Sequence, residues 1–459
     1  MNQCDTIAAI ATAMAGSGIG IVRVSGNKSF EIVEKIFRPG KKEKRITEQH
    51  AYTMHYGWIM DGEEMIDEVI ILLMRGPRSY TSEDTVEIDC HGGVYVTRRI
   101  LELIIKKGAR AAEPGEFTKR AFLNGRIDLS QAEAVMDVIQ AKNEYALKSS
   151  VNQLCGSVLR LIQKIREQII YEIAFIESAL DDPEHISLDG YPEKLHEKVE
   201  NLIKKTEELL INADQGKILK EGIKTVIIGK PNAGKSSLLN ALTGNERAIV
   251  TEIAGTTRDT LEEQIRIRDL ILNIVDTAGI RKTEDLVEKI GVDKAKESLK
   301  DADLVLYIVD SSTELDENDK EILSLLEGQR VIMLLNKTDL PSVTDAQVMR
   351  KIFSGPLVSI SAKEESGLDT FADLLEEMFL NGKISYNNEV YLTNVRQRTA
   401  MEEAKESLKK VRESIESGMP EDFFSIDLTD AYESLGKILG ESMGEDLINE
   451  IFSKFCTGK

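Results

Sequence analysis

A glycine-rich segment in the middle of the chain carries residue types that bind phosphate. Residues 229–236 read GKPNAGKS and follow a run of apolar and β-branched residues. The glycines allow backbone N–H groups to approach phosphate oxygens, while Lys235 supplies a positive charge and Ser236 a hydroxyl ligand for Mg²⁺. Residues 236–242 have helical spacing, so a helix N-terminus would point at the same anion. The segment predicts a phosphate-binding loop between a strand and a helix.

Three further motifs, each preceded by a mostly apolar run, indicate which nucleotide is bound. DTAG at 276–279 offers a carboxylate to the outer shell of the metal and a glycine N–H to the γ-phosphate. NKTD at 336–339 places Asp339 where its carboxylate can accept the N1–H and the exocyclic amine of guanine, a donor pair that adenine lacks. SAK at 361–363 can close the other side of the base. The order of the motifs favours GTP over ATP.

The segment between the phosphate-binding loop and DTAG has the composition of a mobile switch. Residues 251–259 read TEIAGTTRD and are rich in hydroxyl groups and glycine. We assign the hydroxyl of Thr257 to Mg²⁺ as a second side-chain ligand.

The position after DTAG departs from the Ras-type pattern. A glutamine orients the attacking water there in Ras, whereas this chain has Ile280, which has no hydrogen-bonding group. Another residue must position the water, and spacing leaves three carboxylates open: Glu284, Asp285 and Glu288. The charge of the transition state also needs a cation. It can come from an internal arginine, Arg258 or Arg281, or from a monovalent metal ion held by Asn232 and switch carbonyls.

The elements around these motifs predict an α/β multidomain protein. Apolar strands alternate with helical segments at 291–300, 317–327, 344–353 and 367–380, which predicts a Ras-like, doubly wound G domain over residues 217–380. Residues 1–118 alternate short strands with two helices, an α+β domain. Residues 119–216 and 381–459 read as helical, with a break at Asp181-Asp182-Pro183. We expect the two helical parts to form one all-α domain into which the G domain is inserted.

Composition limits the class of protein. No uncharged apolar run approaches the length of a membrane span, and no secretory signal precedes residue 20, so we expect a cytoplasmic protein without a membrane partner. The four cysteines lack metal or redox spacing. The net charge of −21 disfavours nucleic-acid binding, but the first 118 residues are nearly balanced and carry local basic clusters.

The whole chain resembles the MnmE/TrmE family of GTPases that modify the wobble uridine of tRNA. The resemblance rests on segments outside the G domain and on the switch: DTIAA at 5–9, GIGIVRVSG at 18–26, HGG at 91–93, PGEFTKRAFLNG at 114–125, GTTRD at 255–259 and FCTGK at 455–459. The G-domain motifs alone would be shared with ribosome-assembly GTPases. The first 125 residues and the C-terminal tail make the resemblance specific.

The resemblance implies a homodimer formed by the N-terminal domain, which would bind a tetrahydrofolate carrying a 5-formyl or 5,10-methylene group. The folate-contacting positions of the family fall on Arg23, Glu87, Arg126 and Lys459. Arg126 stands where some members have lysine. The arginine keeps the positive charge but presents it on a planar guanidinium group in place of an ammonium group. Cys456 matches a cysteine of the family tail, although Thr457 replaces an aliphatic residue, and we assign it no covalent chemistry.

For the G domain, the resemblance implies hydrolysis of GTP activated by K⁺-dependent dimerisation. The implied K⁺ ligands are the Asn232 side chain and the carbonyls of Thr251, Ile253 and Thr256, and Glu288 matches the acid that positions the water-activating network. A K⁺ ion between phosphates does the electrostatic work of an arginine finger. The complete set expected to contact GTP is Asn232, Ala233, Gly234, Lys235, Ser236, Ser237, Thr251, Glu252, Ile253, Ala254, Gly255, Thr256, Thr257, Asp276, Thr277, Ala278, Gly279, Asn336, Lys337, Thr338, Asp339, Ser361, Ala362 and Lys363.

The family acts with a partner, MnmG, in a heterotetramer or larger assembly. Together they install aminomethyl or carboxymethylaminomethyl groups on the wobble uridine of tRNA. FAD and NADH are expected on MnmG alone, since no GxGxxG fingerprint follows a strand in this chain. Two other readings of the sequence are a ribosome-assembly switch and an ATP-dependent kinase, and Asp339 argues against the second.

Overall fold

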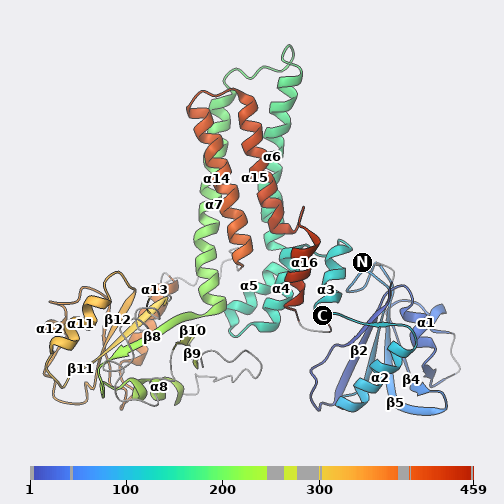
Figure 1. Cartoon of the computed structure of the whole chain (residues 1–459), viewed down its shortest axis with the longest axis horizontal. Helices are drawn as coiled ribbons and strands as arrows, with labels where there is room; N and C mark the ends of the chain where they lie inside the picture. Colours follow the sequence, from blue (N-terminus) through green and yellow to red (C-terminus); the bar gives the residue numbers. More distant parts are fainter. Residues whose placement is uncertain are drawn as a thin grey trace. The chain divides into compact units, whose positions relative to one another are not determined.

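The computed structural model describes residues 5–41, 45–244, 263–275, 302–380 and 394–455, together with residues 299, 392 and 458. The chain divides into two compact units (Figure 1). The first comprises Met1–Gln140, Ser150–Lys204 and Thr399–Lys459, and the second comprises Ala141–Ser149 and Lys205–Arg398. Within the described residues, no helix is both long and apolar enough to cross a membrane.

The N-terminal part of the first unit is a seven-stranded sheet in the order β3-β4-β5-β6-β2-β1-β7. Its pairs are antiparallel except β1 with β7. The strands are β1 (Ile7–Ile10), β2 (Ile19–Ser25), β3 (Phe37–Pro39), β4 (Thr53–Asp61), β5 (Glu64–Met74), β6 (Thr85–His91) and β7 (Arg110–Ala111). Apolar side chains on one face form a core with α1 (Ser29–Glu34) and α2 (Val94–Lys106). The alternating pattern of the strands produces this one-sided burial.

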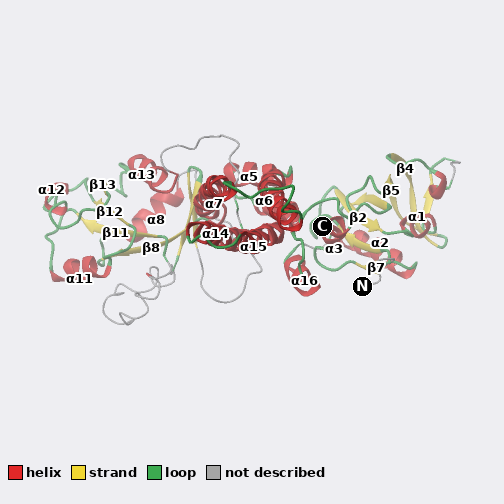
Figure 2. Ribbon diagram, turned by 90° about the horizontal axis from the view of Figure 1, so that it is seen from above, coloured by secondary structure: helices red, strands yellow, loops and turns green. Residues whose placement is uncertain are grey.

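The helical part of the chain joins segments far apart in the sequence and contributes residues to both units. Its helices are α3 (Glu116–Leu123), α4 (Leu129–Gln140), α5 (Glu144–Leu154), α6 (Ser157–Asp181), α7 (Tyr191–Glu221), α14 (Val395–Glu416), α15 (Glu421–Leu439) and α16 (Glu445–Ser453). The long helices α6, α7, α14 and α15 lie side by side in both views (Figures 1 and 2). Phe452 and Ile448 of α16 pack on Leu129 and Met136 of α4. The expected joint packing of the two helical parts is confirmed.

The region 130–180, which has helical spacing throughout, contains two breaks. The chain leaves the helix at 141–143 and again before α6, where Gly156 has φ 80°. A left-handed residue ends a helical ladder, and glycine adopts that conformation without steric cost. The predicted break after Asp181 is present, since α6 ends at that residue.

The second unit contains a six-stranded sheet in the order β13-β12-β11-β8-β10-β9. All pairs are parallel except β9 with β10. The strands are β8 (Ile223–Gly229), β9 (Glu263–Ile267), β10 (Leu270–Ile274), β11 (Leu304–Asp310), β12 (Val331–Asn336) and β13 (Leu357–Ser359).

Helices cover both faces of this sheet. One core contains side chains of α8 (Lys235–Gly244) and α13 (Leu368–Leu380), and the other contains side chains of α11 (Glu317–Leu325) and α12 (Ala346–Met349). Burial on both faces explains why β11 and β12 read as continuous apolar runs. The predicted class is confirmed: an α/β multidomain protein with an α+β N-terminal domain, a helical domain and an inserted doubly wound domain.

Candidate functional sites

The predicted phosphate-binding loop connects β8 to α8. Asn232 and Gly234 have φ values of 60° and 101°. A side chain at Gly234 would meet Asn336 Nδ2 at 2.0 Å, so only glycine fits. The Lys235 ammonium donates to the carbonyls of Gly229 (2.6 Å) and Lys230 (2.7 Å), and burial lowers its pKa. Ser236 and Ser237 are exposed in the first turn of α8, where their backbone N–H groups lack helical partners.

Asn336 links three of the predicted motifs. It is 2% exposed, and its Nδ2 donates to the carbonyl of Ala233 at 2.9 Å. Its Oδ1 accepts from the N–H of Ala362 at 3.0 Å. The amide therefore ties the phosphate-binding loop and the SAK segment to the end of β12. Because the carboxyl ends of parallel strands lie at one edge of the sheet, segments distant in sequence meet there.

Polar contacts also join the NKTD and SAK segments at this edge of the sheet. The Ser361 hydroxyl donates to Asp339 Oδ1 at 2.7 Å, and this bond, aided by Lys363 and Lys337, lowers the pKa of Asp339. The carboxylate is thus kept ionised and oriented as an acceptor. Lys337 Nζ lies 2.6 Å from Asp310 Oδ2 at the end of β11. The Thr338 N–H donates to the carbonyl of Ile360 at 3.2 Å.

Several predicted residues fall outside the described part of the chain. These are Thr251, Glu252, Ile253, Ala254, Gly255, Thr256, Thr257, Asp276, Thr277, Ala278, Gly279, Glu288, Cys456 and Lys459. Of the predicted Mg²⁺ and K⁺ ligands, Ser236 and Asn232 are described. The Ser236 hydroxyl, beside the Lys235 ammonium at a helix N-terminus, fits a Mg²⁺ ion bound with phosphate. Among the described residues, no group of three or more His, Cys, Asp or Glu side chains could hold a metal ion.

A second group of predicted residues meets on the N-terminal sheet. Arg23 of β2 and Glu87 of β6 are directly opposed, and the Arg23 guanidinium contacts Glu87 Oε1 at 2.7–2.8 Å. Arg23 Nη1 also donates to the carbonyl of Gly458 at 3.2 Å. The Arg126 guanidinium lies 5.0 Å from the ring centre of Tyr80 and donates to its carbonyl. Arg23, Glu87 and Arg126 are therefore brought together.

Tyr80 was not among the residues predicted from the sequence. Its ring lies between two guanidinium groups, with Arg23 at 5.4 Å and Arg126 at 5.0 Å from the ring centre. Its hydroxyl bonds Thr118 Oγ1 at 2.9 Å, and the ring of Phe117 lies 5.6 Å from Arg23. An aromatic residue in a loop just before β6 is the only signal that the sequence carried. The N-terminal cluster is defined here as Arg23, Glu87, Tyr80, Phe117 and Arg126.

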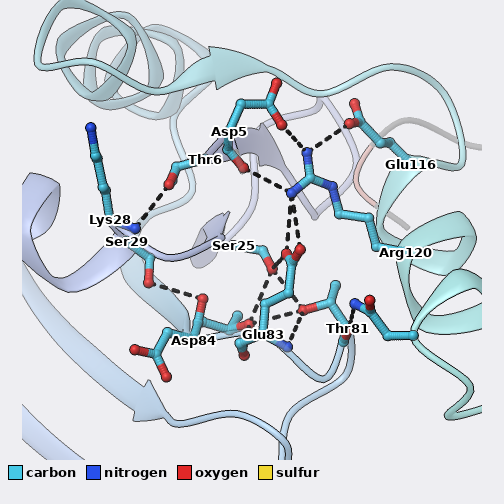
Figure 3. Close-up of polar contacts among 12 residues, drawn as sticks. Asp5, Thr6, Ser25, Lys28, Ser29, Thr81, Glu83, Asp84, Glu116 and Arg120 are labelled. Atoms are coloured by element: carbon cyan, nitrogen blue, oxygen red, sulfur yellow. Dashed lines mark hydrogen bonds and ion pairs between the residues drawn. The ribbon is translucent and has the colours of Figure 1, made fainter. Parts of the chain in front are cut away.

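A buried polar network next to the N-terminal cluster fixes α3 to the sheet (Figure 3). The Arg120 side chain is 11% exposed and contacts the carboxylates of Asp5, Glu83 and Glu116 at 2.5–3.2 Å. Although burial opposes it, bonds from Arg110 and Arg120 lower the pKa of Glu116. The network holds the segment before β6 and the start of α3, which contribute Tyr80 and Phe117, in fixed positions.

Family models match two parts of the chain. The model for the GTP-binding protein TrmE N-terminus matches residues 6–126, and the model for the MnmE helical domain matches residues 129–456. A relative from Lachnoclostridium phytofermentans, named tRNA modification GTPase MnmE, is 56% identical over 457 residues, with 100% of each chain covered. The chain belongs to the MnmE family.

Other MnmE relatives align over almost the whole chain too. Proteins of the same name from Acetivibrio thermocellus and Clostridioides difficile are each 47% identical. The alignment covers 100% of both chains for the first and 99% of both chains for the second. The predicted resemblance to MnmE is thereby confirmed.

Proposed function

We propose that this chain hydrolyses GTP in a reaction that depends on K⁺ and on pairing of two G domains. As an MnmE family member it is a GTP hydrolase of the tRNA-modification class. The observation that supports a guanine nucleotide site best is the buried Asn336, which joins the phosphate-binding loop to the SAK segment beside an oriented Asp339 carboxylate. That arrangement positions phosphate and base contacts before a nucleotide arrives, which lowers the ordering cost of binding.

The roles of individual residues follow from their chemistry. Lys235 and the N–H groups that start α8 would bind phosphate, and Ser236 with Thr257 would hold Mg²⁺, which offsets phosphate charge when bound. Asn232 and the carbonyls of Thr251, Ile253 and Thr256 would hold K⁺. Because Ile280 cannot orient water, Glu288 would position the water-activating network.

The salt dependence of turnover tests the K⁺ proposal. We expect GTP turnover to be at least tenfold faster in KCl than in NaCl, since a missing transition-state cation costs at least that much. Glu288→Ala and Asn232→Ala should remove most of the KCl rate, whereas the matched control Glu284→Ala should keep it. Equal rates in both salts, or full activity of Glu288→Ala, would contradict the metal-ion mechanism.

We further propose that the N-terminal cluster binds a 5-formyl- or 5,10-methylene-tetrahydrofolate. The ring of Tyr80 offers a stacking surface for a pterin, and the adjacent guanidinium groups suit the carboxylates of the glutamate tail. Lys459 would add a further cation. Tyr80→Leu should weaken calorimetric binding of 5-formyl-tetrahydrofolate about tenfold, which is the scale of one lost aromatic contact. Tyr95→Leu, an exposed tyrosine of α2, is the control and should bind normally.

The domain boundaries that we propose are 1–118, 119–216, 217–380 and 381–459. A homodimer through the first domain is supported by exposed apolar side chains on the paired strands β4 and β5, where Tyr56 opposes Ile70 beside the 72%-exposed Met54. Sedimentation of wild type against Met54→Glu/Ile70→Lys tests it: the variant should be a monomer, and an unchanged dimer would contradict this interface.

We propose that the chain acts in the cytoplasm with MnmG, which would carry FAD and NADH, to add aminomethyl and carboxymethylaminomethyl groups to the wobble uridine of tRNA. The support is family membership over the full length of the chain. Mass spectrometry of tRNA nucleosides from a strain lacking the gene tests this role. Unmodified wobble uridines are expected, and complete modification would instead favour a ribosome-assembly switch.

A further inference from the structure

A network of charged residues connects the phosphate-binding loop to the start of α11. Lys230 Nζ lies 2.9 Å from Asp316 Oδ2 and 2.5 Å from Asp319 Oδ2. The two carboxylates also form the capping box of α11, in which each accepts from the backbone N–H of the other. Tyr307 of β11 donates its hydroxyl to Asp319 Oδ1 at 2.8 Å. Lys230 is therefore the cation of a network of four residues, with Asp316, Asp319 and Tyr307 as the others.

The backbone of Lys230 has a second role in the loop. Its carbonyl accepts a hydrogen bond from the ammonium of Lys235, the cation that would contact phosphate. The same residue thus anchors α11 through its side chain and the phosphate-contacting lysine through its carbonyl. Although burial opposes it, Asp319 and Asp316 hold the pKa of Lys230 above its ordinary value, so the side chain stays charged at neutral pH.

The negative charges of Asp316 and Asp319 disfavour binding of an anion at the neighbouring loop. Asp319 is almost fully buried, with its side chain 4% exposed, so water screens its charge poorly. Without a neighbouring cation, Asp316 and Asp319 would repel the phosphates of a nucleotide. Lys230, a residue of the loop with its side chain 25% exposed, forms ion pairs with both carboxylates.

We infer that Lys230 is a positioning residue for guanine nucleotides, which holds the first residues of the phosphate-binding loop against α11 and screens the carboxylates of Asp316 and Asp319 from the phosphates. This inference rests on the proposed function, since it requires that a nucleotide binds at the loop. Screening makes the contribution of Lys230 grow with the number of phosphate charges, from GMP to GDP to a GTP analogue. A contact that only stabilises the fold has no such dependence.

The test measures binding of these nucleotides to the full chain by competition with fluorescent GDP. Lys230→Met should raise the Kd for GDP about tenfold, which corresponds to about 1.4 kcal/mol, with a larger increase for the triphosphate and a smaller one for GMP. Lys230→Arg should bind GDP nearly as well as wild type. The matched control is Lys320→Met. It removes one charge from an exposed ion pair between Lys320 and Glu317 of α11 and should leave the affinity for GDP unchanged.

Asp316→Asn distinguishes the two parts of the proposed role of Lys230: screening of the carboxylates from the phosphates, and holding of the loop against α11. Asparagine caps a helix as well as aspartate, so this variant keeps α11 capped and removes one carboxylate. We expect Asp316→Asn to bind GDP at least as tightly as wild type, and Lys230→Met/Asp316→Asn to recover part of the loss. The inference is overturned if Lys230→Met binds GDP like Lys320→Met, or if Asp316→Asn weakens binding. A wild-type chain without affinity for GDP would overturn the proposed function as well.

Discussion

Replacing Asn336 by alanine should destabilise the G domain and weaken nucleotide binding. The side chain is 2% exposed and bonds the carbonyl of Ala233 at 2.9 Å and the N–H of Ala362 at 3.0 Å. Alanine leaves both backbone groups buried without these partners. Each such group costs about 1–3 kcal/mol, so we expect a loss of roughly 2–4 kcal/mol in the free energy of unfolding of the G domain, allowing for some entry of water.

The same substitution should weaken nucleotide binding. The loop and the SAK segment would relax in the free protein to satisfy their backbone groups, and binding would have to restore the original geometry. A loss of about 1.4–2.8 kcal/mol corresponds to a 10- to 100-fold higher Kd for GDP, measurable by isothermal titration calorimetry. Urea unfolding followed by circular dichroism gives the stability change.

A matched control for this prediction is Asn240→Ala. Asn240 is exposed on α8, one helical turn beyond the phosphate-binding loop, so its loss should change neither stability nor GDP affinity appreciably. If Asn336→Ala binds GDP as tightly as Asn240→Ala and unfolds at the same urea concentration, Asn336 does not hold the site together.

Two further predictions concern the N-terminal sheet, whose unfolding is reported by the fluorescence of Trp58, the only tryptophan of the chain. Arg120→Met removes the buried cation that contacts Asp5, Glu83 and Glu116, of which Asp5 and Glu116 keep ion pairs with Arg110. It should cost about 3 kcal/mol of unfolding free energy; a loss below 1 kcal/mol would contradict this. The pKa of Glu116 lies below its ordinary value in the fold. Its carboxylate therefore stabilises the domain at neutral pH, and this stabilisation is lost as the pH falls through the folded pKa. Glu116→Gln should therefore be less stable at pH 7 and show a flatter decline from pH 5 to pH 3; parallel pH curves would count against it.

The sequence predicted those parts of the fold that local patterns determine. Strands β11 and β12 are continuous apolar runs because both faces of the sheet are covered, and each delivers polar residues at its carboxyl end. The break after Asp181 follows from two aspartates and a proline, which disfavour a helix interior. The expected segment 344–353 was too long, because α12 extends only over Ala346–Met349.

Contacts across long sequence separations could not be predicted. The pairing of Arg23 with Glu87 depends on the register of β2 with β6, and register follows from which face of the whole sheet is buried. Tyr80 lies between two guanidinium groups only because α3 packs where Arg120 fixes it. The bond from Asn336 to Ala233 likewise requires strand order, which the spacing of motifs does not contain.

Base preference tests the central claim, a guanine nucleotide site with Asp339 as the recognising carboxylate. The measurement is the unfolding temperature of the full chain and of Asp339→Asn with saturating GDP, ADP or xanthosine diphosphate. GDP should stabilise the wild type and ADP should not. Asp339→Asn should be stabilised by xanthosine diphosphate in place of GDP, because the amide offers a donor to the additional carbonyl of xanthine. Equal stabilisation of the wild type by ADP and GDP, or an unchanged preference for GDP in Asp339→Asn, would contradict it.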